Sequence, residues 1–175
     1  MNSDLKQRAN IYNKMKLLYV CGTYYPATGG AEISAHTLFK HLSKRGIEVH
    51  VMTDERYTFP EAKIKLDDII IYGVSHSTRE NTLNKLIYNI NPHVIYTQLM
   101  WSDIALATAK LFNIPSVLRI CQVPYKQNIT VNSMYSPKKI ICVSTEVKNY
   151  INKYYSRDSE IISPTIDIEY LRQQY

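Results

Sequence analysis

Several features are scarce or missing in this 175-residue sequence, and each absence excludes a class of protein. No apolar run approaches the roughly 18 to 20 residues that a membrane-spanning helix needs. Residues 1–14 are too polar for a signal peptide. The three cysteines, Cys21, Cys121 and Cys142, lie in or next to apolar runs, and their spacing is typical of neither a metal site nor a disulfide framework. We therefore expect a cytoplasmic chain with reduced, mostly buried thiols.

The signatures of several enzyme classes are also absent. There is no G-x-G-x-x-G fingerprint, which argues against an NAD enzyme. The histidines, cysteines and acidic residues nowhere show metal-ligand spacing, so we expect no metal, and no Ser-His-Asp assembly can be read from their order. His36 and His41 fall away from the apolar stripe of a predicted helix, and we expect both to be solvated.

The chain carries a formal net charge of +6, which favours an anionic partner such as a nucleotide-sugar or a phospholipid surface. No nucleic-acid reading motif accompanies the charge, so we expect no nucleic-acid partner. Lys40, Lys44 and Arg45 share the polar side of a predicted helix. A solvated helix face is the usual explanation; contact with an anionic membrane surface, which would make the protein membrane-peripheral, is the alternative.

The apolar pattern alternates between strands and helices, which predicts an α/β fold, a Rossmann-like three-layer sandwich with a parallel sheet. Residues 17–21 are apolar without interruption, as expected of a central strand buried on both faces. The most regular helix runs over 31–45, where Gly46 ends an apolar stripe formed by Ala31, Ala35, Leu38, Phe39 and Leu42.

The same alternation continues to the end of the chain. Further strands are predicted at 47–53, 69–72, 93–97, 116–121 and 139–143, with a short extended piece at 160–166. Further helices are predicted before Pro92, at 102–112 and after a capping Ser144. We therefore divide the chain into a polar extension (1–14), one Rossmann-like domain (15–160) and the start of a linker (161–175).

Ligands of open parallel sheets bind beyond the carboxyl ends of the strands. The loop after the first strand ends in Gly29-Gly30, where a helix begins. Two glycines let the backbone approach a ligand closely, and the positive helix terminus would favour an anion. The alternative is that the pair only shapes a tight loop.

Three segments carry a family resemblance. KLLYVCGTYYPATGGAEISAHTLFKHLSKRGIEVHVMT (16–53) resembles the opening of retaining GT-B glycosyltransferases of family 4. NPHVIYTQ (91–98) and KKIICVSTEVKNYINKYYSRDSEIISPTIDIEYL (138–171) resemble later parts of the same N-terminal domain. The resemblance implies one half of a GT-B architecture, the half that holds the sugar acceptor.

By that resemblance, a cleft facing the donor diphosphate or the reacting sugar is formed by Gly29, Gly30, Ala31 and Glu32. The substrate of the full enzyme would be a nucleotide-diphosphate sugar, and this domain would hold no cofactor. A C-terminal donor-binding domain, from the same gene or a separate subunit, would be its partner. The chain ends before such a domain, so we expect it to be inactive alone.

The candidate acceptor contacts follow the strand ends: Tyr24, Gln98, Trp101, Cys121, Gln122 and Ser144. Many family members have a histidine where this sequence has Cys121-Gln122 and another near Thr97-Gln98, so we name no catalytic residue. Trp101 could stack on a sugar or pack at a helix start. Arg119 lies within an apolar strand, where it needs either a structural ion pair or an anionic ligand.

The sequence leaves two candidate functions open. The first is the acceptor-side domain of a nucleotide-sugar-dependent glycosyltransferase that transfers a sugar to a glycan or lipid-linked acceptor, with retention of configuration. The second is a noncatalytic binding or regulatory subunit that keeps the fold.

Overall fold

The computed structural model describes residues 15–27, 29–57, 63–123 and 136–164. Its strands are β1 (Lys16–Val20), β2 (Glu48–Asp54), β3 (Ile64–Leu66), β4 (Ile69–Val74), β5 (Val94–Gln98), β6 (Ser116–Ile120), β7 (Lys139–Cys142) and β8 (Glu160–Ile161). Its helices are α2 (Gly30–Lys44), the 3-10 turn η1 (Glu55–Tyr57), α3 (Arg79–Ile90), α4 (Ser102–Leu111) and α6 (Thr145–Tyr155).

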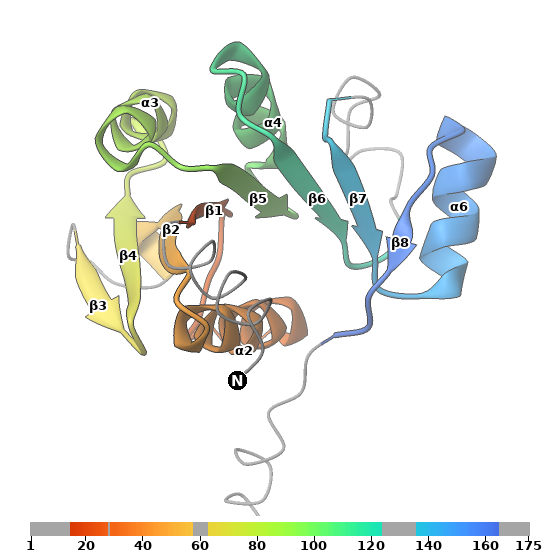
Figure 1. Ribbon diagram of the computed structural model, residues 1–175, viewed down its shortest axis with the longest axis horizontal. Helices are drawn as coiled ribbons and strands as arrows, with labels where there is room; N and C mark the ends of the chain where they lie inside the picture. Colours follow the sequence, from red (N-terminus) through yellow and green to blue (C-terminus); the bar gives the residue numbers. More distant parts are fainter. Residues whose placement is uncertain (1–14, 28, 58–62, 124–135, 165–175) are drawn as a thin grey trace, which may run out of the picture.

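The strands form one sheet in the order β3-β4-β2-β1-β5-β6-β7-β8 (Figure 1). From β1 the chain first builds outward through β2 and β4, then returns to the other side of β1 and continues from β5 to β8. The strand order therefore reverses at β1, and in open α/β sheets such a reversal marks where ligands bind.

The expected parallel sheet is confirmed except at one edge, where β3 runs antiparallel to β4. A two-residue turn, Asp67-Asp68, joins these strands, and both of its residues have positive φ, 48° and 63°. Such a turn suits a hairpin, whereas a parallel pair needs a crossover connection. The three-residue strand β3 was not predicted from the sequence.

The three layers are visible in Figure 1, with α2 on one face of the sheet and α3 and α4 on the other. A first core cluster joins α2 to β1, β2 and β4 through residues such as Phe39, Tyr19 and Val51. A second cluster packs α3 and α4 on the opposite face, and a third joins α4 and α6 to β6 and β7. The predicted three-layer sandwich is therefore confirmed.

Consecutive residues of β1 face opposite layers. Leu18 and Val20 belong to the cluster under α3 and α4, whereas Leu17 and Tyr19 belong to the cluster under α2. Leu18, Tyr19 and Val20 are fully buried. This explains the uninterrupted apolar run, because a strand covered on both faces has no solvent-facing side.

The helix boundaries agree with the sequence signals. Gly46, which follows the end of α2, has a positive φ of 87°. Asn91 caps the end of α3 in the left-handed conformation, directly before Pro92. The Ser144 hydroxyl accepts a hydrogen bond from the Val147 N–H at 3.3 Å and caps α6 as predicted. The division into an extension, a domain and a linker stays a prediction, since residues 1–14 and 165–175 lie outside the described residues.

No helix in the described part of the chain is both long enough and apolar enough to cross a membrane.

The double-sided burial of β1 predicts a large stability effect. Leu18→Ala should lower the free energy of unfolding by about 2–5 kcal/mol, because it removes a fully buried side chain and leaves a cavity. Leu111→Ala is the control, because this side chain is 78% exposed. Urea unfolding followed by circular dichroism measures both. Equal stability of the two variants would contradict the assignment of β1 to the centre of the core.

Candidate functional site

The loops after β1 and β5 touch where the strand order reverses. The Gly22 N–H donates a hydrogen bond to the Met100 carbonyl at 3.1 Å. A Cβ placed on Gly22 would lie 2.7 Å from the Met100 Cβ, so only glycine allows this approach. The two loops therefore form a single edge at the carboxyl ends of the central strands.

The N-terminus of α2 opens onto this edge, and a carboxylate of the same helix covers part of it. Glu32 accepts a hydrogen bond from the Thr23 hydroxyl at 2.5 Å. A Cβ on Gly29 would collide with Glu32 Oε2, so the Glu32 side chain folds back toward the N-cap residue. Gly30, in contrast, has open space around its α-carbon. Both predicted glycines are exposed, but the Glu32 carboxylate lies close beside Gly29, whereas Gly30 has open space next to it.

The position of Glu32 follows from helix capping. It is the third residue after the N-cap, the place from which a glutamate reaches back to the helix start, and its negative charge complements the helix dipole. An external anion at this terminus would meet that carboxylate.

Two of the predicted acceptor contacts, Gln98 and Cys121, lie next to each other beneath α2. The fully buried Gln98 donates its Nε2 to the Ala31 carbonyl at 3.1 Å, and the Cys121 thiol lies 3.6 Å from Gln98 Oε1. Burial raises the pKa of the Cys121 thiol, and the Arg119 charge only partly offsets this. These bonds hold the first turn of α2 on the sheet.

Arg119 is 5% exposed and packs against the same helix. Its Nη2 donates to the Ser34 hydroxyl at 3.0 Å, and its Nη1 has no hydrogen-bond partner among the described residues. The ion pair expected from the sequence is not found within the described residues, because α2 presents a hydroxyl here and no carboxylate. Burial raises the pKa of the nearby Tyr96 to about 12, and the Arg119 charge opposes that rise.

The expectation that His36 is solvated is wrong. His36 is buried and not solvated: its Nδ1 is hydrogen-bonded to the Tyr24 hydroxyl and its Nε2 to Asp67 Oδ2, both at 3.0 Å. Burial lowers the pKa of His36, while Asp67 raises it in part. Tyr25 stacks on the imidazole with ring centroids 4.3 Å apart. Tyr24, a predicted acceptor contact, thus ties the loop after β1 to α2.

The remaining predicted contacts lie apart. Trp101 is partly buried against the core cluster under α3 and α4, and its ring centroid is 6.1 Å from that of His76. Gln122 is exposed, and Ser144 is engaged in capping α6.

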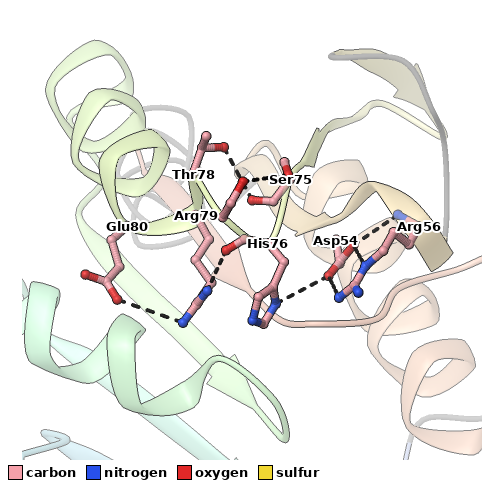
Figure 2. A network of polar contacts seen from close by, with 8 residues as sticks. Asp54, Arg56, Ser75, His76, Thr78, Arg79 and Glu80 are labelled. Atoms are coloured by element: carbon pink, nitrogen blue, oxygen red, sulfur yellow. Dashed lines mark hydrogen bonds and ion pairs between the residues drawn. The ribbon is translucent and has the colours of Figure 1, made fainter.

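A polar network that the sequence reasoning missed occupies the carboxyl ends of β2 and β4 (Figure 2). Asp54, the last residue of β2, accepts hydrogen bonds from Arg56 Nε at 2.9 Å and Nη2 at 2.6 Å. His76 Nδ1 lies 3.7 Å from Oδ2 of the same carboxylate, the oxygen that also accepts from Arg56 Nη2. The available sequence signal was an acidic residue that directly ends a buried strand.

The network continues to the start of α3. The Arg79 guanidinium donates to the His76 carbonyl, and its Nη2 lies 4.0 Å from Glu80 Oε1 (Figure 2). Hydrogen bonding from Arg56 lowers the pKa of Asp54, although burial acts in the opposite direction. Within the described ranges, no group of three or more His, Cys, Asp or Glu side chains is placed to hold a metal ion.

Comparison with protein families gives one match. The family model of Glycosyltransferase Family 4 matches residues 28–170, which is most of the chain. No curated protein matches it.

Three solved structures illustrate the fold that this chain shares. Sucrose-phosphate synthase from Thermosynechococcus elongatus has a TM-score of 0.68 at 11% identity, over 86% of this chain and 47% of that one. HepE of Anabaena in complex with UDP has a TM-score of 0.61 at 14% identity, over 91% and 50%. An alpha-glucosyltransferase in complex with UDP and DNA has a TM-score of 0.60 at 13% identity, over 91% and 45%. The chain thus spans about half the length of the structures that it resembles.

The lowered pKa of Asp54 predicts a pH-dependent contribution to stability. Asp54→Asn should lower the free energy of unfolding by about 1–3 kcal/mol at pH 7, because Arg56 and His76 lose their charged partner. The deficit should persist down to about pH 4, the ordinary aspartate range, and shrink below it as the native carboxylate becomes protonated.

Urea unfolding of both proteins from pH 7 to pH 3 measures this difference. Glu146→Gln, at an exposed carboxylate, is the control. A deficit that is the same at every pH would show that the charge of Asp54 does not contribute.

Proposed function

The chain belongs to Glycosyltransferase Family 4, and from this premise we propose that it is the acceptor-side half of a nucleotide-sugar-dependent glycosyltransferase. In this proposal residues 15–160 form the acceptor domain, and 161–175 begin the connection to a donor-binding domain. The complete enzyme transfers a sugar to a glycan or lipid-linked acceptor, and this half alone is inactive. Retention of anomeric configuration rests on family membership only.

The observation that carries the proposal is the open N-terminus of α2 at the point where the strand order reverses. Gly30 leaves space above the first turn of a 15-residue helix. The amides of such a first turn have no intrahelical acceptors and favour an anion. A diphosphate group of the donor is therefore the ligand that this terminus suits, with Gly30 and Ala31 as its nearest contacts.

Glu32 sets a condition on that ligand. Its carboxylate lies against Gly29 and is held by Thr23. A diphosphate that approached Gly30 would meet a like charge a few ångströms away, which costs about 1 kcal/mol in bulk water and more near a protein surface. Glu32 must rotate away, or it must be compensated by cations from the donor domain.

The acceptor hydroxyl would be oriented at the strand ends, since positioning and charge stabilisation carry much of the barrier reduction in such transfers. No general base is assigned to β5 or β6. Gln98 is committed to Ala31, and burial raises the pKa of Cys121 away from the thiolate form. The donor phosphate or the partner domain would have to accept the proton.

These same strand ends favour the alternative, a noncatalytic binding subunit with this fold. Gln98 is fully buried, and its amide is committed to the Ala31 carbonyl and to the half-buried Cys121, so this strand end serves the packing of α2. Localisation in the cytoplasm, with Lys44 and Arg45 at the exposed end of α2 meeting an anionic membrane, is a further part of the proposal.

Titration of the chain with UDP and with GDP, followed by backbone amide NMR, tests the proposed donor site. UDP is the first probe because two of the structurally similar proteins were solved with it. We expect saturable shifts at Gly30 and Ala31. Glu32→Gln should bind the nucleotide about fivefold more tightly, because it removes a like charge while keeping a hydrogen-bonding side chain.

Glu146→Gln is the matched control, because Glu146 lies in the first turn of α6, far along the sheet from this loop. It should bind as the wild type does. Absence of shifts at residues 29–31 with either nucleotide would count against a donor contact in this half and favour the noncatalytic subunit. Unchanged affinity in Glu32→Gln would show that Glu32 does not oppose the ligand.

A further inference from the structure

A second group of side chains lies at the carboxyl edge of the sheet, separate from the glycine loop. It consists of the Asp54 network and the neighbouring Trp101 ring, brought by the ends of β2, β4 and β5. The Asp54 side chain is 2% exposed, whereas those of Arg56 and His76 are 58% and 52% exposed. The carboxylate is therefore an internal anchor, and the two basic side chains form the outer surface.

We propose that Asp54, Arg56, His76 and Trp101 form a subsite for a neutral sugar ring, the ring of the acceptor. The identification of that sugar as the acceptor rests on the proposed function; the binding of a sugar ring here does not.

The chemistry of the group suits a sugar. A pyranose ring offers vicinal hydroxyls at its edge and a face of C–H groups. Arg56 and His76 offer hydrogen-bond donors side by side, and the indole of Trp101 offers an apolar face with a polar N–H. Small-molecule sites commonly combine an apolar surface with a few fixed polar groups in this way.

The local charge favours a neutral ring over an acidic one. Two arginines, Arg56 and Arg79, are balanced by the two carboxylates of Asp54 and Glu80 (Figure 2). Among the described residues of this network, both guanidinium groups already face carboxylates, so an added phosphate or carboxylate would compete with Asp54 and Glu80 for them. A neutral hydroxyl-rich ligand carries no such repulsion.

The donors are already held in place without a ligand. Arg56 is fixed through two bonds to Asp54, and Asp54 Oδ1 also accepts the Arg56 backbone N–H at 3.0 Å. Arg79 donates to the His76 carbonyl and fixes the turn that carries the imidazole. Binding would therefore lose little side-chain entropy at these residues.

The subsite also lies next to the proposed donor site. Trp101 directly follows Met100, whose carbonyl accepts from the Gly22 N–H in the loop that leads to α2. A sugar ring at Trp101 would thus sit beside the loop whose far end is Gly29, which is the relation that an acceptor needs to a donor.

The chain has a single tryptophan, so its indole N–H resonance reports on this subsite alone. The experiment titrates the 175-residue chain with the methyl glycosides of glucose, galactose, mannose and N-acetylglucosamine, and with glucuronate and glucose 6-phosphate. We expect at least one neutral glycoside to shift the Trp101 resonance saturably. Asp54→Asn and Arg56→Gln should each weaken that binding about tenfold, and Glu146→Gln should not change it.

Arg56→Gln changes a side chain that is more than half exposed, so it keeps the test valid if Asp54→Asn fails to fold. No shift with any neutral glycoside, a shift with the acidic sugars alone, or equal binding by wild type and Arg56→Gln would overturn the subsite. If sugars shift the Trp101 resonance but nucleotides do not shift Gly30, the sugar subsite is supported and the donor contact at Gly30 is contradicted. If nucleotides shift Gly30 but no sugar shifts Trp101, the donor contact is supported and the sugar subsite is contradicted.

Discussion

Burial of β1 on both faces is the constraint on which the rest of the structure depends. Leu18 and Val20 pack under α3 and α4, while Tyr19 packs under α2, so a slip of one residue would exchange the two cores. The register with β2 and β5 is fixed in the same way. Because that register decides where each strand ends, it also places Gly30, Asp54 and Trp101 along the carboxyl edge of the sheet.

Between α2 and the sheet, polar groups serve to position the helix. Gln98 holds the Ala31 carbonyl, Arg119 holds Ser34, and His36 joins the loop at Tyr24 to the hairpin at Asp67. Each bond crosses from one element to another, so together they fix the start of α2 in direction as well as in position. The anion site proposed at this terminus would depend on that orientation, since the effect of the helix dipole is confined to the first turn.

Much of the fold was predictable because its signals are local. The apolar run at 17–21, the stripe along α2 and the Ser144 cap each depend on residues within a few positions. The site was harder to predict, because its partners are distant in sequence. Asp67, which makes burial of His36 tolerable, is 31 residues away, and His76 approaches Asp54 from the turn after β4. The strand β3 escaped prediction because three residues carry too little periodicity. The position of Glu32 in the first turn of α2 follows a capping pattern, yet its approach to Gly29 could not be predicted from the sequence.

The contact between Gly22 and Met100 has a thermodynamic consequence. It joins the loop that leads to Gly29 with the turn that presents Trp101 through a direct backbone hydrogen bond, and the Met100 side chain packs against Gly22. If a ligand at one proposed site displaces its segment, this hydrogen bond transmits part of the displacement to the other segment. The two proposed sites would then be coupled, and by linkage the coupling free energy would have the same size in both directions, whichever molecule arrives first.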